Sequence, residues 1–328
     1  MAQVFLIGLG AGAASALLFA SVTSGNFLSV FLFYLSALPI MLAAIAWSHV
    51  AGALAVTIGG LSLGIVLNFW IALVYLASVG VPAYVLSYMA MLGRQVGEAP
   101  GGAPQMEWYP AGRLVIWAGL IGAALVTAVV LQFGPSFETY QTSINATFER
   151  VLKIQAQIPA DQPLKIPGIE NPQQFVNTLV AIIPPAAAVL SMLTSLINLW
   201  LAGRIARVSG RLQRPWPELS AIAFPPFTPL LFAAAIGVSF LSGMPGFIAA
   251  VLVAVLTVAY AILGFAVLHA VTRGVGARGW LLAASWIGVI VFGWPLVFVA
   301  VLGIADSLFD LRGRVAARKP PFPPIQRN

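Results

Sequence analysis

The chain has 328 residues, of which 60% are hydrophobic and only 8% are charged, and its mean hydropathy is +0.98. Soluble domains carry roughly 25% charged residues, so this composition excludes a soluble globular protein and predicts an integral membrane protein. The net charge of +7 comes from basic residues between apolar runs and at the C-terminus. Membrane insertion favours that distribution, so we expect no nucleic-acid partner. The chain has no cysteine, which excludes disulfides, thiolate metal sites and cysteine catalysis.

The apolar runs are long and unbroken, and this identifies the kind of membrane fold. Backbone polar groups in lipid must be paired within the protein, which leaves helices and closed barrels. Barrel strands alternate apolar and polar residues, and these runs do not. We therefore predict an all-α, polytopic transmembrane helical bundle with about eight to nine spans of about 20 residues each. The N-terminus lacks the basic region and cleavage motif of a signal peptide, so we expect its first run to be a retained helix.

Residues 1–133 are predicted to form an N-terminal helical bundle of five spans. The runs are Val4–Val22, Phe27–Trp47, Ala51–Leu67, Phe69–Leu92 and Leu114–Phe133. In the first run, small residues recur every four positions, at Gly8, Gly12, Ala16 and Ala20. Such a face lets helix backbones approach closely. It serves either packing inside the bundle, which is the commoner use, or docking of a partner membrane protein.

Residues 134–174 form the longest polar segment, which we expect to lie outside the membrane. Apolar residues recur at helical spacing from Phe137 to Leu152. This pattern predicts an amphipathic helix that lies on the membrane or over the bundle. The second part, Pro159–Pro172, is rich in proline and is predicted to be an extended loop.

Residues 175–311 are predicted to form a C-terminal helical bundle, and residues 312–328 a basic tail. The apolar runs are Phe175–Leu201, Phe227–Ser242, Phe247–Val271 and Trp280–Ile304. Pro184 and Pro185 interrupt the first of these, and Pro39 and Pro82 lie in earlier runs. Prolines kink membrane helices and free backbone carbonyls. Two uses remain open for these kinks, namely simple tolerance in lipid and the shaping of a cavity.

The basic residues predict the orientation of the chain. The segment Arg204–Arg214 carries four arginines and is therefore expected in the cytoplasm. Counting from it places the N-terminus and Gly93–Arg113 inside and residues 134–174 outside. A count of nine spans would place the basic tail outside, against this rule. We therefore expect a cytoplasmic tail, either because the last run bends back at Gly293-Trp294-Pro295 or because the count is wrong at an earlier element.

The sequence shows no chemical signature of an enzyme. The acidic residues fall in loops, at interfaces or in the tail, and no paired carboxylates, nucleophile–base set or nucleotide-binding motif is visible. We therefore predict no catalytic residues, no metal site and no cofactor, and a protein that is not an enzyme. Polar residues inside or beside the apolar runs are candidates for lining a small-molecule pocket. They are Asn68, Asn177, Ser191, Thr194, Ser195 and Asn198.

The N-terminal part resembles the substrate-binding S-components of energy-coupling-factor vitamin transporters. The likeness is carried by the small-residue first helix, by Leu38-Pro39 and by an apolar run that ends in Ala46-Trp47-Ser48-His49 before Gly52 and Gly59-Gly60. It implies a solute pocket that faces outside. It also implies a first helix that docks, through Gly8, Gly12 and Ala16, on a transmembrane coupling subunit.

The whole chain is similar to the YybS-like family of predicted bacterial membrane proteins of unknown function. Three stretches carry this likeness: Asn198–Ala202 followed by Arg204 and Arg207, Leu263–Val267, and Leu302–Arg312. The last stretch supplies a candidate C-terminal signature. Its residues are Gly303, Asp306, Phe309, Asp310 and Arg312.

These observations lead to two hypotheses for function. The first is a solute-binding or transport protein of the bacterial inner membrane, with the amphipathic helix Phe137–Leu152 as an outer lid over a small, largely apolar or weakly polar ligand. The second is a non-catalytic scaffold or assembly factor for cell-envelope machinery, which uses the basic tail as its contact. Membrane lipid is a partner in both. The first adds a coupling subunit and the second an envelope protein.

Overall fold

The computed structural model describes residues 1–98, 104–155, 157, 159, 162 and 171–318. Seven helices in this part of the chain are long and apolar enough to cross a membrane, which confirms the predicted polytopic helical bundle. The chain forms two compact units. Unit 1 contains Met1–Trp216 and Ala234–Val255, and unit 2 contains Pro217–Ala233 and Leu256–Asn328. Two helices, Thr228–Ser239 and Gly243–Val271, contribute to both units.

Of the first four candidate spans of unit 1, the first and third each contain a helix of 18 or 19 residues, and the second and fourth consist of shorter helices in succession. The four spans are α1 (Ala2–Ala20) with η1 (Ser21–Ser24), α2 (Phe27–Tyr34) with α3 (Leu38–Ala46), α4 (His49–Val66), and α5 (Phe69–Tyr75) with the π-helix η2 (Leu76–Gly80) and α6 (Val81–Ala90). Three of these helices begin at a polar cap whose side chain accepts a hydrogen bond from the backbone N–H three residues later. The caps are Asn26, Ser48 and Asn68. Such caps satisfy donors that the helix itself leaves free.

The small-residue face of α1 packs inside unit 1. A Cβ added at Gly12 would lie 2.6 Å from the carbonyl oxygen of Ala55 on α4, and Gly8 is equally close to Leu54. Ala16 is buried as well, and Ala20 is half-buried. In the structure this face packs on α4, which is the commoner of the two predicted uses, and docking of a partner stays a prediction.

A two-stranded hairpin interrupts the otherwise helical chain and was not predicted. Strands β1 (Gly93–Glu98) and β2 (Pro104–Trp108) pair antiparallel, with Arg94 opposite Glu107 and an irregularity between Gln95 and Gly97. Helix α7 (Ala111–Gln132) follows. The hairpin was missed because each strand is short and the irregularity breaks the alternation that signals a strand.

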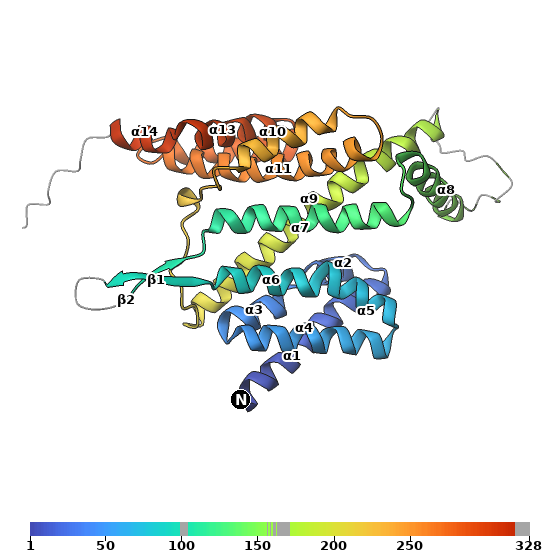
Figure 1. Ribbon diagram of the computed structural model, residues 1–328, viewed down its shortest axis with the longest axis horizontal. Helices are drawn as coiled ribbons and strands as arrows, with labels where there is room; N and C mark the ends of the chain where they lie inside the picture. Colours follow the sequence, from blue (N-terminus) through green and yellow to red (C-terminus); the bar gives the residue numbers. More distant parts are fainter. Residues whose placement is uncertain (99–103, 156, 158, 160–161, 163–170, 319–328) are drawn as a thin grey trace, which may run out of the picture. The chain divides into compact units, whose positions relative to one another are not determined.

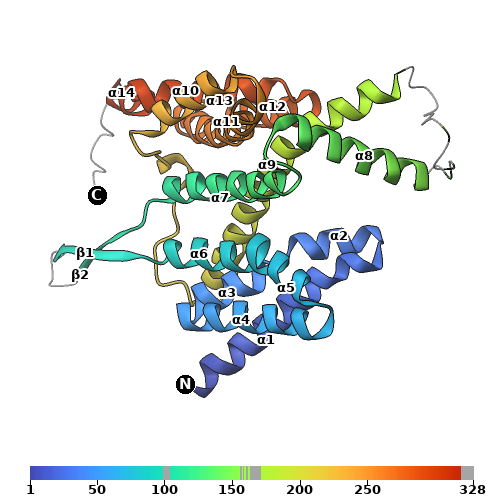
Figure 2. The ribbon, with the colours of Figure 1, turned by 45° about the vertical axis from the view of Figure 1, so that its right-hand side comes forward.

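The outer part of unit 1 contains the predicted amphipathic helix. Helix α8 (Phe137–Gln155) confirms that prediction, and α9 (Pro172–Val208) follows it. Most of the predicted loop Pro159–Pro172 lies outside the described residues. Figures 1 and 2 show α8 and the β-hairpin at opposite ends of unit 1.

Unit 2 is built around the C-terminal half of α11 (Gly243–Val271). Unit 2 also contains η3 (Leu219–Ala221), the first part of α10 (Thr228–Ser239), α12 (Arg278–Phe292), α13 (Pro295–Phe309) and α14 (Leu311–Arg318). The close approach of α13 to α11 depends on two glycines. A Cβ at Gly303 would overlap the carbonyl of Tyr260, and a Cβ at Gly264 would overlap the carbonyl of Val299.

The last apolar run is two helices, as the bend predicted at Gly293–Pro295 requires. Gly293 has a φ of 72°, which glycine adopts without the cost that a Cβ would bring, and Pro295 then begins α13. Helices α12 and α13 have 15 residues each and α10 has 12. The predicted seventh and ninth runs therefore form helices that are shorter than the seven candidate spans.

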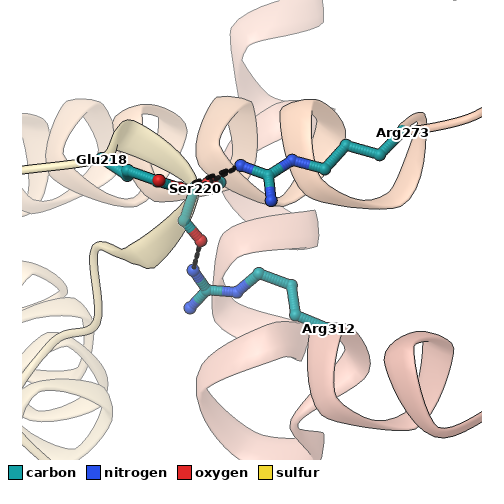
Figure 3. A network of polar contacts seen from close by, with 4 residues as sticks. All are labelled: Glu218, Ser220, Arg273 and Arg312. Atoms are coloured by element: carbon teal, nitrogen blue, oxygen red, sulfur yellow. Dashed lines mark hydrogen bonds and ion pairs between the residues drawn. The ribbon is translucent and has the colours of Figure 1, made fainter. Parts of the chain in front are cut away.

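A polar cluster joins the two ends of the α12–α13 segment (Figure 3). The Arg273 guanidinium donates to Ser220 Oγ at 2.6 Å and pairs with Glu218 at 3.0 Å, and Arg312 donates to the carbonyl of Ser220 at 2.7 Å. Hydrogen bonds from Arg273 and from Ser220 Oγ to the Glu218 carboxylate favour its charged form and lower the pKa of Glu218. Arg312 also pairs with Asp306 at 2.7 Å. The end of α11 and the start of α14 therefore lie at the same end of unit 2.

Candidate functional site: a lidded cavity along helix α9

Helix α9 carries two adjacent prolines in its membrane-crossing part. Pro184 and Pro185 lie inside its 37 residues. Proline has no backbone N–H, so each removes one hydrogen bond to the carbonyl four residues earlier. The carbonyls of Val180 and Ala181 are thereby left without their usual helical donors. Pro184 itself is buried.

Helix α8 lies over this part of α9. Its apolar face carries Phe137, Ile144, Phe148 and Leu152, which pack on a buried cluster built around Tyr140, Val130 of α7 and Val180 of α9. The Tyr140 ring also contacts Phe247 of α11, with ring centroids 5.3 Å apart. The amphipathic pattern therefore produces a lid that is packed on the bundle, with its polar face outward.

Two hydrogen bonds fasten the lid to α9. Tyr140 Oη donates to the carbonyl of Val180 at 3.2 Å, which is the carbonyl that Pro184 frees. Asn145 Nδ2 donates to Asn177 Oδ1 at 2.8 Å. Burial raises the pKa of Tyr140, so its hydroxyl remains a donor beyond the ordinary range of a tyrosine.

A cavity of about 430 Å³ lies beneath the lid. Its walls come from α5 and η2, α7, α8 and α9, and they are almost entirely apolar. Tyr140, Ile144 and Phe148 form the side under α8, and Pro184 lies in the wall from α9. The rim residues Val74 and Val129 are 59% and 58% exposed, so the cavity opens at the surface of the helices that would face lipid.

A second cavity of about 240 Å³ adjoins the first. The two share Ser78, Ala187 and Ser191 as wall residues. The second is more polar because hydroxyl side chains line it. These are Ser36, Ser78, Ser191, Thr194 and Ser195. An apolar cavity thus adjoins a smaller one that is lined by hydroxyl groups.

The π-helix η2 contributes to both cavities. It covers Leu76–Gly80 and directly precedes Pro82 at the start of α6. Ser78 lies in η2 and donates to the carbonyl of Val74 at 2.7 Å. Single turns of π-helix are rare and frequently occur at functional sites, and this one contributes Ser78 to the wall that the two cavities share.

The six predicted pocket residues lie in four different settings. Ser191, Thr194 and Ser195 line the second cavity. Asn198 is buried below them, and its Nδ2 donates to the carbonyls of Tyr34 and Thr194 at 2.8 Å. Asn177 holds the lid, and Asn68 lies outside both cavities, where it caps α5 and is exposed.

Sequence reasoning missed Ser36 and Ser78. Both lie where a regular α-helix is interrupted. Ser36 lies between α2 and α3, and Ser78 lies within the π-helix η2. The proline that follows each of them within a few residues was the available signal.

The candidate C-terminal signature lies in unit 2, whereas both cavities lie in unit 1. Gly303 lets α13 approach α11, and Asp306 is only 5% exposed and pairs with Arg312. Asp310 ends α13 with a φ of 48°, and Phe309 is 54% exposed. These residues therefore organise the end of α13 and the start of α14.

Comparison with known proteins places the chain in a family. It matches no curated protein and no solved structure. A family model described as "Predicted membrane protein (DUF2232)" matches residues 13–307, a range that begins within α1, ends within α13 and includes the residues that line both cavities. The chain therefore belongs to this family of predicted membrane proteins.

Proposed function

We propose that the protein binds a small, weakly polar solute in the two adjoining cavities and acts as a membrane solute-binding or transport protein. The observation that carries this proposal is the apolar chamber of about 430 Å³ beneath a hydrogen-bonded lid helix. Ligand pockets are typically concave and mostly apolar, with a few placed polar groups. The hydroxyl groups of Ser191 and Thr194 in the second chamber fit that description.

The arrangement gives a solute dissolved in the lipid a path into the apolar cavity. The rim between α5 and α7 opens at the surface of two membrane-crossing helices, so an apolar molecule in lipid reaches the chamber without crossing water. The lid α8 closes the chamber at one end of unit 1. The proposal requires no catalytic step and no cofactor, and it leaves the S-component likeness and a coupling subunit as predictions.

The same proposal includes an orientation in a bacterial inner membrane. The β-hairpin, with Arg94 and Arg113 near its base, lies at the opposite end of unit 1 from α8. Basic segments favour the cytoplasmic side, so we infer that the hairpin and the N-terminus are cytoplasmic and that the lid is outside.

The test is a comparison of two tryptophan variants in the same helix. Ala187 lines both cavities, whereas the neighbouring Ala186 lines neither and is exposed. Protein purified in mild detergent is analysed by mass spectrometry for bound small molecules. We expect a stoichiometric small molecule with the natural chain and with Ala186→Trp, and its loss with Ala187→Trp.

Two results would overturn the proposal. One is the absence of any small molecule above background from the natural chain. The other is equal retention by both variants. Co-purification of a cell-envelope protein with no small molecule would instead support the scaffold hypothesis.

A further inference from the structure

A separate hollow of about 400 Å³ lies at the base of the β-hairpin, at the other end of unit 1 from the lid. Its walls include Arg94 and Glu107 from the paired strands, Trp108 and Tyr109 from the end of the hairpin, and Arg113 from the first turn of α7. Unlike the cavities along α9, this hollow combines charged groups with aromatic rings.

The aromatic wall of the hollow is firmly supported. Gly93 leaves room for the Trp108 ring, because a Cβ there would lie 3.1 Å from it. On the Trp108 ring lies the guanidinium of Arg214, 5.9 Å from the ring centroid. Arg214 also donates to the carbonyls of Ala90, at the end of α6, and Tyr109. These contacts fix the base of the hairpin to the segment after α9.

The hollow has a surplus of positive charge. Arg94 Nε pairs with Glu107 Oε2 at 2.7 Å, so these two charges offset each other. Arg113 lies over the Tyr109 ring at 5.8 Å. Among the described side chains, no carboxylate forms an ion pair with Arg113. Its guanidinium is therefore available to an anion, and arginine is well suited to bind phosphate oxygens in a bidentate way.

The position of the hollow relative to the membrane helices indicates which anion it meets. It lies between the last residue of the span Phe69–Ala90 and the first of the span Ala111–Gln132, at the level where two spans leave the hydrocarbon core. Tryptophan and tyrosine prefer this level, and lipid phosphates lie there. We propose that the hollow binds a phosphate group, with Arg113 as its main ligand and with the Trp108 and Tyr109 rings as its walls.

The phosphate can belong to an anionic lipid headgroup or to a free phosphate ester, and one experiment separates the two sources. Purified full-length protein in a zwitterionic detergent is titrated with short-chain phosphatidylglycerol, short-chain phosphatidylcholine or glycerol phosphate, and binding is followed by thermal stabilisation. The variants are Arg113→Gln, Arg113→Lys and the control Arg278→Gln, which removes the same charge at the start of α12.

We expect Arg113→Gln to weaken phosphatidylglycerol binding roughly tenfold or more, Arg113→Lys to weaken it less, and Arg278→Gln to leave it unchanged. Response to phosphatidylglycerol alone identifies the lipid headgroup, and an equal response to glycerol phosphate identifies a free ester. Both support the site. Phosphatidylcholine carries the same phosphate without the net negative charge, so an equal response to it identifies the phosphate alone as the ligand. A response to phosphatidylglycerol that Arg113→Gln leaves unchanged, or equal effects of Arg113→Gln and Arg278→Gln, would overturn the site. Arg113 is exposed, so its variants should fold, and their unfolding temperature without ligand checks this.

Discussion

The Asp306 carboxylate is buried and forms an ion pair with Arg312. Its side chain is 3% exposed, and that of Arg312 is 18% exposed. Arg312 donates to both carboxylate oxygens, through its backbone N–H and its guanidinium. The sequence places the acidic residues in loops, at interfaces or in the tail, and it does not predict that Asp306 is buried. The spacing of four residues between Asp306 and Asp310 gives no sign that only one of them is buried, because it places both on the same helical face.

Removal of the Asp306 charge should destabilise unit 2. Loss of one member of a buried pair leaves the other charge uncompensated, at a cost of about 3 kcal/mol. We expect Asp306→Asn to lower the free energy of unfolding by this amount in a denaturant titration of the purified protein. The matched control is Asp310→Asn, because Asp310 is exposed and Asn tolerates its left-handed φ. A loss of similar size in both variants would contradict this account.

At the scale of elements, a missing hydrogen bond in one helix positions another helix. Pro184 frees the carbonyl of Val180, and Tyr140 from α8 takes its place as donor. The sequence predicts the kink and the apolar face of α8. It does not predict their pairing, because helical periodicity identifies a face and not the carbonyl that the face meets. The same limit applies to α1, whose small-residue spacing is identical for internal packing and for docking.

This coupling predicts non-additive variants. Tyr140→Phe keeps the ring and leaves the carbonyl unpaired, so it should lower the free energy of unfolding by about 1 kcal/mol. In a Pro184→Ala background the new N–H satisfies the same carbonyl, so the further cost of Tyr140→Phe should nearly vanish. Double-mutant cycles in a denaturant titration measure this.

The control background for the cycle is Pro185→Ala, which restores the donor for Ala181 instead. The full cost of Tyr140→Phe should persist there. An equal cost of Tyr140→Phe in all three backgrounds would show that Tyr140 and Pro184 act independently.

The crossing of α11 and α13 makes a second prediction about elements. Gly303 has no room for a methyl group, because the Tyr260 carbonyl and the Gly264 backbone nitrogen occupy that space. Gly303→Ala should therefore cost about 1–3 kcal/mol by overpacking. Gly288 of α12 has nothing within 4 Å of an added Cβ, so Gly288→Ala should be neutral or slightly stabilising. Thermal unfolding of both variants checks this, and equal melting temperatures would refute the proposed close contact.

At the scale of the whole molecule, the sequence predicts the class of fold more readily than the side of the membrane on which each segment lies. Hydropathy alone indicates a helical membrane bundle, because the lipid environment leaves few alternatives. The side of the tail is not predictable in this way, since it depends on whether α12 and α13 act as one span or as two short helices. The contacts of Arg273 and Arg312 with Ser220 bring the two ends of this segment together.

Because the chain has no cysteine, its membrane topology can be tested directly by single-cysteine labelling. Val96 of the hairpin, Ala146 of the lid and Ala316 of α14 are exposed. In sealed membrane vesicles, an impermeant thiol reagent should label Val96→Cys and Ala316→Cys from the same side and Ala146→Cys from the other. Labelling of Ala316→Cys together with Ala146→Cys would show that the α12–α13 segment crosses the membrane.

The length of α12 and α13 has a consequence for the surrounding bilayer. Each has 15 residues and is therefore about 22 Å long, whereas the hydrocarbon core is about 30 Å thick. A helix shorter than the core is accommodated by local thinning, at a cost of fractions of a kcal/mol per Å. If α12 and α13 each cross the bilayer and return the chain to the same side, unit 2 carries a hydrophobic mismatch. Bilayer thickness is then a variable in its folding free energy, and thinner bilayers should favour the folded protein.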